Sequence, residues 1–275
     1  MIQYDLLVCI RCHAHLDFVV DTMQSVEYYT NPEHTRVVFV VDGGFKRFAN
    51  KLIDAVGQDR VCVGSRRWGW GSGLWCLLVE SVLHFERSCR FLHFQSIDYD
   101  TLYINHGVDR LVLDRIDSEK VGLLGNYSPT NKKWGSVYGK TKTRFEKIFG
   151  NVPSTYRPGE GVQGGFMSLS ATLLERMRER GMFGPPYSIA KKYTYIADDH
   201  LLPIFTRMCG LDIVDTSSFS ACRWRARRDP RGIEKNGMVV FHPTKLTPHN
   251  KTRTTDVRIR NYFRELRGCK DMLIP

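Results

Sequence analysis

The first hundred residues alternate strand-like with helix-like segments, and this alternation limits the fold more than any other feature of the chain. Short β-favouring runs lie at residues 4–10, 36–42, 60–64 and 90–98. Stretches with helical spacing separate them, at residues 16–30, 45–57 and 71–86. Strands that alternate with helices form parallel sheets whose faces the helices cover. We therefore predict an α/β fold with a mixed, mostly parallel central sheet flanked by helices.

Length and composition indicate one globular domain. The chain has 275 residues, of which 42% are hydrophobic and 12% aromatic, near the upper limit for a single hydrophobic core. Its 8 cysteines are too dilute for a disulfide scaffold, and Cys9 and Cys12 lack a second CxxC to complete a zinc site. Reduced core thiols are expected. Charges interrupt every apolar run well before a membrane-spanning length, and the first residues lack a basic leader, so we expect a cytoplasmic protein.

The surplus of basic residues favours an anionic partner. The chain carries 40 Lys and Arg against 29 Asp and Glu, a formal net charge of +11. Such a charge suits nucleotide phosphates, nucleic acid or an acidic membrane surface, so peripheral membrane association stays open. The basic residues are scattered, and no RNP, zinc-finger or helix-turn-helix signature occurs. We therefore expect no nucleic-acid partner, and a nucleic-acid-binding module is only an alternative.

Two aspartates close the fourth predicted strand, in HFQSIDYDTLYI at residues 93–104. Side chains alternate along a strand, so Asp98 and Asp100 are expected to point the same way. Adjacent carboxylates repel unless a positive group sits between them. Mn²⁺ and Mg²⁺ prefer carboxylate ligands together with substrate phosphates. The two acids thus suit a divalent-cation site at the end of this strand, with a turn that caps a helix or strand as the alternative.

Other polar residues follow the neighbouring strands. Ligands gather beyond the carboxyl ends of strands in open α/β sheets, and Arg11, Asp42 and Arg66 fall there as substrate-binding candidates. Asp42 suits a nucleotide base or ribose, with a turn before two glycines as the equal alternative. Arg66 and Arg67 suit phosphate, with an exposed charge pair as the alternative. No GxGxxG follows the first strand and no GxxxxGK[ST] occurs, which argues against dehydrogenases and P-loop proteins.

The order strand, Asp-x-Asp, apolar strand resembles the GT-A glycosyltransferases, and later segments extend the resemblance over about residues 4–246. These segments are a glycine pair in EGVQGGF, an acid pair in YIADDHLL and a strand-end histidine in GMVVFHPTKL. The resemblance implies an enzyme that moves a sugar from a nucleoside diphosphate sugar to a hydroxyl acceptor such as a glycan. A UDP-sugar is the expected donor.

The resemblance also implies roles for the cation and the base. Asp98, Asp100 and His242 would hold Mn²⁺ or Mg²⁺ against the donor diphosphate. Asp199 would take the proton from the acceptor hydroxyl, as in inverting enzymes, because a base at a helix start can face the crevice. Asp198 would cap the same helix beside the substrate, where the helix dipole stabilises a carboxylate.

Further substrate contacts follow from the same resemblance. Gly164 and Gly165 would let the substrate approach the backbone, because glycine has no Cβ. Asp98 would also contact the ribose, and Lys245 would contact the diphosphate. Aromatic residues Trp68, Trp70 and Trp75 offer a sugar-stacking face, but at this spacing a place in the core is the commoner case.

Two enzyme alternatives stay open. The segments at 60–85 and 197–208 are similar to the branching β-1,6-N-acetylglucosaminyltransferases, which work without a metal, lack Asp-x-Asp and set basic side chains against the diphosphate. The basic segment CRWRARRDPRG at 222–232 could serve that purpose. A nucleotidyltransferase is the other alternative, although CIRCHAHLD at 9–17 matches its glycine- and lysine-rich loop poorly.

The domain plan follows from these assignments. We expect one GT-A-like catalytic domain over 1–275, made of a nucleotide-sugar-binding half (1–105), an acceptor and catalytic half (106–246) and a basic C-terminal extension (247–275). Within them we expect an exposed polar connection at 126–142 and a helix at 256–268.

Overall fold

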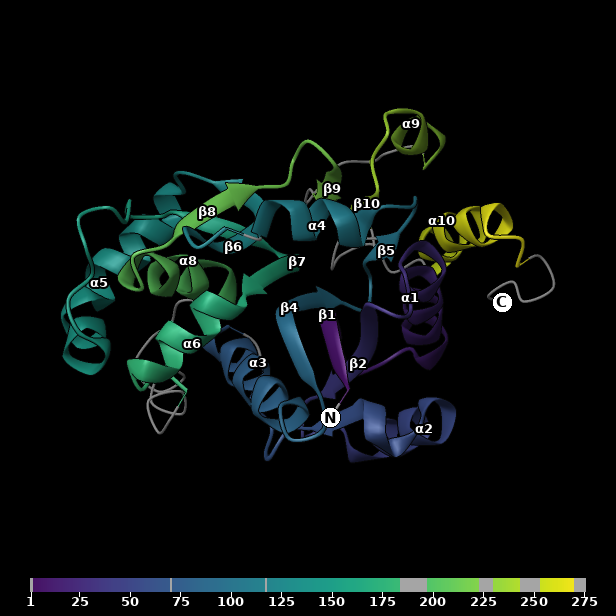
Figure 1. The fold of residues 1–275 in the computed structure, drawn as a ribbon, viewed down its shortest axis with the longest axis horizontal. Coiled ribbons are helices and arrows are strands. Elements are labelled where there is room, and N and C mark those ends of the chain that lie inside the picture. The colour runs from purple at the N-terminus through teal and green to yellow at the C-terminus, as the bar shows by residue number, and fades with distance from the viewer. Residues whose placement is uncertain are drawn as a thin grey trace.

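The computed structural model describes residues 2–69, 71–116, 118–183, 197–222, 230–242 and 253–269. They form two sheets with helices on both faces of the larger one (Figure 1). None of the helices in these ranges combines the length and the apolar character that crossing a bilayer requires.

The first half confirms the predicted alternation of strands and helices. Its elements are β1 (Gln3–Cys12), α1 (Leu16–Tyr29), β2 (Thr35–Val41), α2 (Lys46–Val56), the 3₁₀ turn η1 (Gln58–Arg60), β3 (Val61–Val63), α3 (Ser72–Phe85) and β4 (Arg90–Asp98). Each predicted run lies within a few residues of the observed element, because strong apolar periodicity and glycine-bearing turns mark the boundaries here.

The second half mixes longer and shorter elements. It comprises β5 (Leu102–Tyr103), α4 (Val108–Ile116), β6 (Val121–Ser128), α5 (Lys132–Phe149), β7 (Gly161–Ser170), α6 (Ala171–Glu179), α8 (Asp198–Met208), β8 (Asp212–Asp215), β9 (Ser220–Cys222), α9 (Pro230–Lys235), β10 (Val240–His242) and α10 (Arg253–Leu266). The helix predicted at 256–268 is confirmed as α10.

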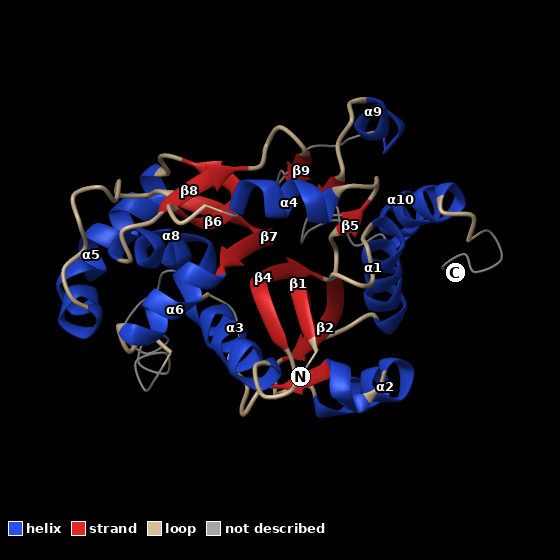
Figure 2. Cartoon of the chain, in the orientation of Figure 1, coloured by secondary structure: helices blue, strands red, loops and turns tan. Residues whose placement is uncertain are grey.

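The main sheet is mixed and mostly parallel, as predicted. Its strands lie in the order β3-β2-β1-β4-β7-β6-β8 (Figure 2). Strand β7 runs antiparallel to both of its neighbours, and the remaining pairs are parallel. The carboxyl ends of β1, β2 and β4 therefore open onto one edge of the sheet.

A small second sheet brings the end of the chain's last strand back to that edge. Strand β10 pairs antiparallel with β5 and parallel with β9. Because β5 follows the Asp-x-Asp segment directly, this pairing sets His242, the last residue of β10, near Asp98 and Asp100.

Alternate residues of the central strands belong to two hydrophobic layers, one on each face of the main sheet. In β1, Leu7 and Cys9 pack with the buried faces of α3, α5, α6 and α8. Leu6, Val8 and Ile10 pack with α1, α2 and α4 on the other face. This period of two is what a central strand with both faces covered requires.

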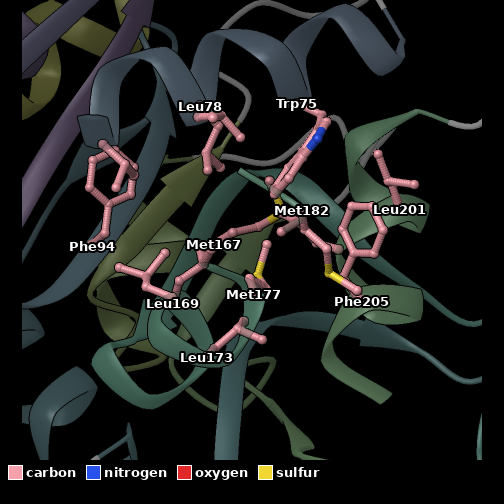
Figure 3. Packing of buried hydrophobic residues seen from close by; sticks show 14 of the residues in the cluster. Trp75, Leu78, Phe94, Met167, Leu169, Leu173, Met177, Met182, Leu201 and Phe205 are labelled. Atoms are coloured by element: carbon pink, nitrogen blue, oxygen red, sulfur yellow. The ribbon is translucent and has the colours of Figure 1, made fainter. Parts of the chain in front are cut away.

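Two of the three candidate sugar-stacking tryptophans lie in the core. Trp68 is 2% exposed and Trp75 is fully buried. The Trp75 ring packs 5.0 Å from Phe205, and Figure 3 shows it among the methionines and leucines of that layer. The core interpretation is therefore confirmed for these two, and Trp70 lies outside the described residues.

The exposed connection predicted at 126–142 is wrong. Strand β6 continues to Ser128 and helix α5 begins at Lys132. Tyr138, Thr141 and Phe145 recur at helical spacing and are buried at 5%, 8% and 0% exposure. Gly135 and Gly139 weaken the helical pattern in the sequence, but the packing of this apolar face outweighs their low propensity.

Candidate active site

Arg11, Asp42 and Asp98 lie together at the carboxyl edge of the main sheet, as their positions at strand ends predicted. Arg11 is directly opposite Asp98 in the register of β1 and β4. Asp42 follows the neighbouring strand β2, whose Val41 is paired with Cys12. The edge therefore carries both signs of charge within a few ångströms.

Asp98, Asp100 and His242 form one cluster, although the histidine comes from a distant part of the sequence. Their ligand atoms lie within 4.8 Å of one another. His242 Nε2 is 3.5 Å from Asp100 Oδ1 and 3.8 Å from Asp98 Oδ2. Asp98 keeps 29% of its side chain exposed, while the other two are almost fully buried. Two carboxylates and an imidazole that converge beside an opening fit a divalent cation.

Gly165 makes room for this cluster. A Cβ atom at Gly165 would lie 2.3 Å from His242 Nε2, and the residue has a φ of +97°, which side chains rarely adopt. Its carbonyl accepts a hydrogen bond from Thr101 Oγ1 at 2.6 Å. At Gly164 a Cβ would meet only Arg11 Nη2, at 3.8 Å. Of the two glycines assigned to substrate approach, Gly165 contacts the histidine and Gly164 borders Arg11.

Arg11 links the Asp-x-Asp segment to helix α8. Its Nε donates to Asp98 Oδ1 at 3.0 Å, and its Nη1 donates to Asp198 Oδ2. Burial alone would lower the pKa of Arg11, but the charges of Asp98 and Asp198 raise it by more than burial lowers it. The guanidinium therefore stays protonated. The sequence predicted Asp198 as a helix cap; the N-cap residue is Ala197, and Asp198 lies in the first turn and pairs with Arg11.

Asp199 is a carboxyl group of this site with a raised pKa. Burial, and after it the negative charge of Asp198, raise the pKa of Asp199 to about 7. Its Oδ1 is buried and has no hydrogen-bond partner among the described residues. Among the described residues, the basic group that lies within 4 Å of this carboxylate is His200, whose Nε2 is 3.8 Å away. Burial lowers the pKa of His200 to about 4, so this imidazole is neutral at pH 7 and does not neutralise the acid.

A cavity of about 130 Å³ adjoins Arg11 and Asp98. Aromatic rings line it: the His13 ring lies 5.3 Å from the Phe45 ring and edge-on to Tyr99 at 5.4 Å. His13 and Phe45 were not among the residues predicted from the sequence. His13 comes immediately after β1, and Phe45 comes after β2 and the two glycines that follow it. A position just beyond a strand end is the signal that could have identified both residues.

The remaining candidates have mixed outcomes. Asp42 lines the cavity, but its carboxylate accepts hydrogen bonds from the backbone N–H groups of Gly44, Trp68 and Gly69 at 3.1, 3.1 and 2.7 Å. Its observed contacts are therefore those of the turn alternative.

The two neighbouring arginines differ in position. Arg66 is exposed, with its guanidinium 4.1 Å from the centre of the Trp68 ring. Arg67, the other member of the pair, lines the cavity. Lys245 and most of the basic segment at 222–232 lie outside the described residues.

The mixed sheet, with an Asp-x-Asp at the end of β4 and a histidine returned to it by β10, has the GT-A fold that the sequence predicted. No family model matches the sequence, and no curated protein matches it. Solved glycosyltransferase structures do match the fold. The bifunctional glycosyltransferase WbbM has 10% identity and a TM-score of 0.50, over 98% of this chain and 52% of that one.

Two further structures give similar values. The mannosyltransferase PcManGT from Pyrobaculum calidifontis, solved with GDP-Man and Mn²⁺, has 12% identity and a TM-score of 0.50 over 95% of this chain and 63% of that one. Mouse xyloside xylosyltransferase 1 has 14% identity and a TM-score of 0.46, over 90% and 100% of the two chains. The present chain thus spans about half of WbbM and less than two thirds of PcManGT.

Proposed function

We propose that this protein is a glycosyltransferase that moves a sugar from a nucleoside diphosphate sugar to a hydroxyl acceptor, with a divalent cation and with inversion. The observation that carries the proposal is the convergence of Asp98, Asp100 and His242 at the carboxyl edge of a GT-A sheet. The fold alone would not suffice, because one fold hosts many activities.

Asp98, Asp100 and His242 are the residues that would hold the cation. Bound there, Mn²⁺ or Mg²⁺ would neutralise the negative charge that develops on the leaving diphosphate. The partly exposed Asp98 borders the cavity, so its carboxylate lies between the cation position and the space for the donor.

Arg11 keeps the neighbouring acids in place. It orients Asp98 from one side and binds Asp198 on the other, so both side chains are held in place. Asp198 therefore serves as a support for α8.

Asp199 is the general base in this proposal. A pKa of about 7 places it near the pH at which a base is both available and strong enough to accept a proton. It precedes a buried neutral histidine and follows the Arg11-bound acid, so it is the member of the acid pair that is not held in an ion pair with arginine. Attack by an acceptor hydroxyl activated in this way inverts the anomeric centre.

The donor base is assigned to the aromatic cavity. His13, Phe45 and Tyr99 offer faces and edges against which a nucleobase can stack. A volume of about 130 Å³ accommodates only part of a sugar nucleotide, so the sugar would extend past Asp98 toward α8. The sequence favours a UDP-sugar, and the structurally similar PcManGT was solved with GDP-Man, so both bases need testing.

The test is a calorimetric screen of UDP-, GDP-, TDP- and CMP-sugars with and without Mn²⁺, using wild type and Asp100→Asn. We expect binding of one nucleotide class that strengthens with Mn²⁺ and loses this dependence in the variant. A matched control is Asp114→Asn, which changes an exposed acid on α4. The proposal fails if no sugar nucleotide binds.

One observation favours a metal-independent variant of the same chemistry. Arg11 already compensates part of the charge of Asp98, at 3.0 Å. Full turnover in EDTA, with a normal dependence on the sugar nucleotide, would favour this variant and remove the cation from the mechanism.

A further inference from the structure

A buried group of charges joins the two ends of the chain. Asp21 of α1 is fully buried and pairs with three arginines of the C-terminal segment, which are themselves 0% to 5% exposed: Arg260, Arg264 and Arg267. Figure 1 shows α10 (yellow) beside α1 (purple). These three arginines of the predicted C-terminal extension therefore face the protein interior.

Arg260 differs from the other two because it also reaches the Asp-x-Asp segment. Its Nη2 donates to the carbonyl oxygen of Tyr99 at 2.7 Å, while its Nη1 donates to Asp21 Oδ2 at 2.6 Å. The guanidinium also lies 4.6 Å from the centre of the Phe18 ring. Both terminal nitrogens of Arg260 are thus hydrogen-bonded, and its guanidinium also contacts an aromatic ring.

The Tyr99 carbonyl belongs to the peptide between the two metal-site acids. It accepts a second hydrogen bond from Thr22 Oγ1, also at 2.7 Å. A carbonyl oxygen has two lone pairs, so both of its acceptor positions are used. The orientation of the 99–100 peptide is therefore fixed from α1 and α10, and the direction in which Asp100 leaves the backbone depends on it.

An ordinary packing role does not account for a charged group at this place. A buried guanidinium is costly unless its partners are well placed, and apolar residues would hold two helices together at least as well. A positively charged donor, by contrast, makes a stronger hydrogen bond to a carbonyl than a neutral one does. The turn gains a rigid anchor that no apolar side chain could supply.

We propose that Arg260 is a positioning residue of the cation site: it holds the Tyr99 carbonyl and through it the Asp100 carboxylate. Helix α10 then contributes to the geometry of the cation site through Arg260. The inference rests on the proposed function in so far as it concerns the cation. The rigidity of the turn itself does not depend on any ligand.

The test compares Arg260→Met with Arg264→Met. Both variants remove one arginine from Asp21, but Arg264, which contacts Asp21 at 3.2 Å, makes no hydrogen bond to the turn among the described residues, so it is the matched control. Mn²⁺ affinity of the purified protein is measured by calorimetry. Loss of a residue that orients a ligand typically weakens metal binding by about 10- to 100-fold, and this is expected for Arg260→Met only. Arg260→Lys should recover part of the affinity.

A second readout needs no metal. The Thr101 amide donates to the Asp98 carbonyl at 2.9 Å and closes the turn, so its hydrogen exchange reports how firmly the turn is held. Hydrogen exchange in a peptide covering residues 97–104 should be faster in Arg260→Met than in Arg264→Met. Each variant is measured the same number of degrees below its own melting temperature. If Arg260→Met does not fold, Thr22→Val removes the other donor to the same carbonyl and should act in the same direction.

The outcomes separate the two proposals. If wild type does not bind Mn²⁺, the cation of the proposed function is refuted, and the exchange experiment still decides the role of Arg260. If Arg260→Met and Arg264→Met bind Mn²⁺ and exchange alike, the positioning role is overturned and the arginines serve only to join α10 to α1.

Discussion

Gly165 lies directly against the imidazole of His242, so close that a Cβ at this position would be 2.3 Å from Nε2. The histidine can approach Asp98 and Asp100 only because residue 165 has no side chain. The glycine pair of the sequence thus has one member that shapes the ligand cluster and one that borders the open edge.

The variant Gly165→Ala should lose both stability and cation binding. The positive φ alone costs roughly 1–3 kcal/mol for a residue with a side chain, and the clash must displace His242 in addition. Urea unfolding and Mn²⁺ calorimetry measure the two effects. Gly164→Ala is the control, because its Cβ would meet nothing closer than 3.8 Å. Equal behaviour of the two variants would contradict the explanation.

Asp100→Asn should remove the divalent-dependent part of nucleotide binding and leave the fold intact. The substitution keeps the size of the side chain and takes away one of two neighbouring negative charges. In the metal-free protein this removes the repulsion between the two carboxylates, so the fold is not destabilised. Melting temperatures with and without Mn²⁺ give the measurement: wild type should rise on adding the metal and the variant should not. A metal-induced rise in the variant equal to that of wild type would argue against a ligand role.

Asp199 should give the turnover number a pH dependence. Since the raised pKa of Asp199 lies at about 7, the basic form is fully present only above that value. Turnover should therefore rise with pH, by roughly tenfold per unit below the pKa, and level off above it. Asp199→Asn should lower turnover by roughly 10²–10⁴-fold and abolish this rise, while the donor affinity stays near wild type. An NMR assignment that shows the donor anomeric configuration kept in the product would exclude this role.

The same carboxyl group should link stability to pH. Its pKa is raised in the folded protein, so the folded state binds a proton more tightly than the unfolded chain. This stabilisation is complete below about pH 4 and is lost as the pH rises through about 7. Chemical unfolding of Asp199→Asn and wild type at pH 5 and pH 8 checks the sign: the variant should lose less stability over this range.

Asp198→Ala should act mainly on stability, in contrast to Asp199→Asn. It removes a buried partner of Arg11 and leaves the guanidinium with Asp98 alone. Breaking a buried ion pair on one side costs about 3–5 kcal/mol, and the surviving pair should bring the loss toward the lower end. Urea unfolding at pH 7 measures it. A loss no greater than that of an exposed control, Asp114→Ala, would show that the pair contributes little.

Local patterns made the fold and the position of the acids predictable. The runs at 36–42 and 90–98 predict strands by their composition, and an acid at a strand end can be assigned to the ligand edge without any structure. His242 was recognised from the order of motifs along the chain. Its distance from Asp100 could come only from the pairing of β10 with β5, which joins segments far apart in sequence.

Long-range contacts account for what the sequence did not reveal. Arg11 has two carboxylate partners that are 87 and 187 residues away, and no local pattern marks either pairing. For the last segment the sequence predicted only a basic extension, and arginines are mostly exposed in folded proteins. Arg260 is instead buried because Asp21 and the Tyr99 carbonyl offer it acceptors, which only the folded arrangement brings together.

The pairing of Asp21 with Arg260 also has a consequence for biosynthesis. The two residues are 239 positions apart, so a ribosome that adds about 5–20 residues per second needs roughly 12–48 s to make the second after the first. During this time α1 carries a carboxylate without its arginine partners, and the Asp-x-Asp turn lacks one of its two anchors. The early strands can pair as they emerge, but the turn takes its final form only when α10 has left the exit tunnel. A chain truncated before residue 253 should therefore fold its central sheet and bind the cation more weakly than the 275-residue chain.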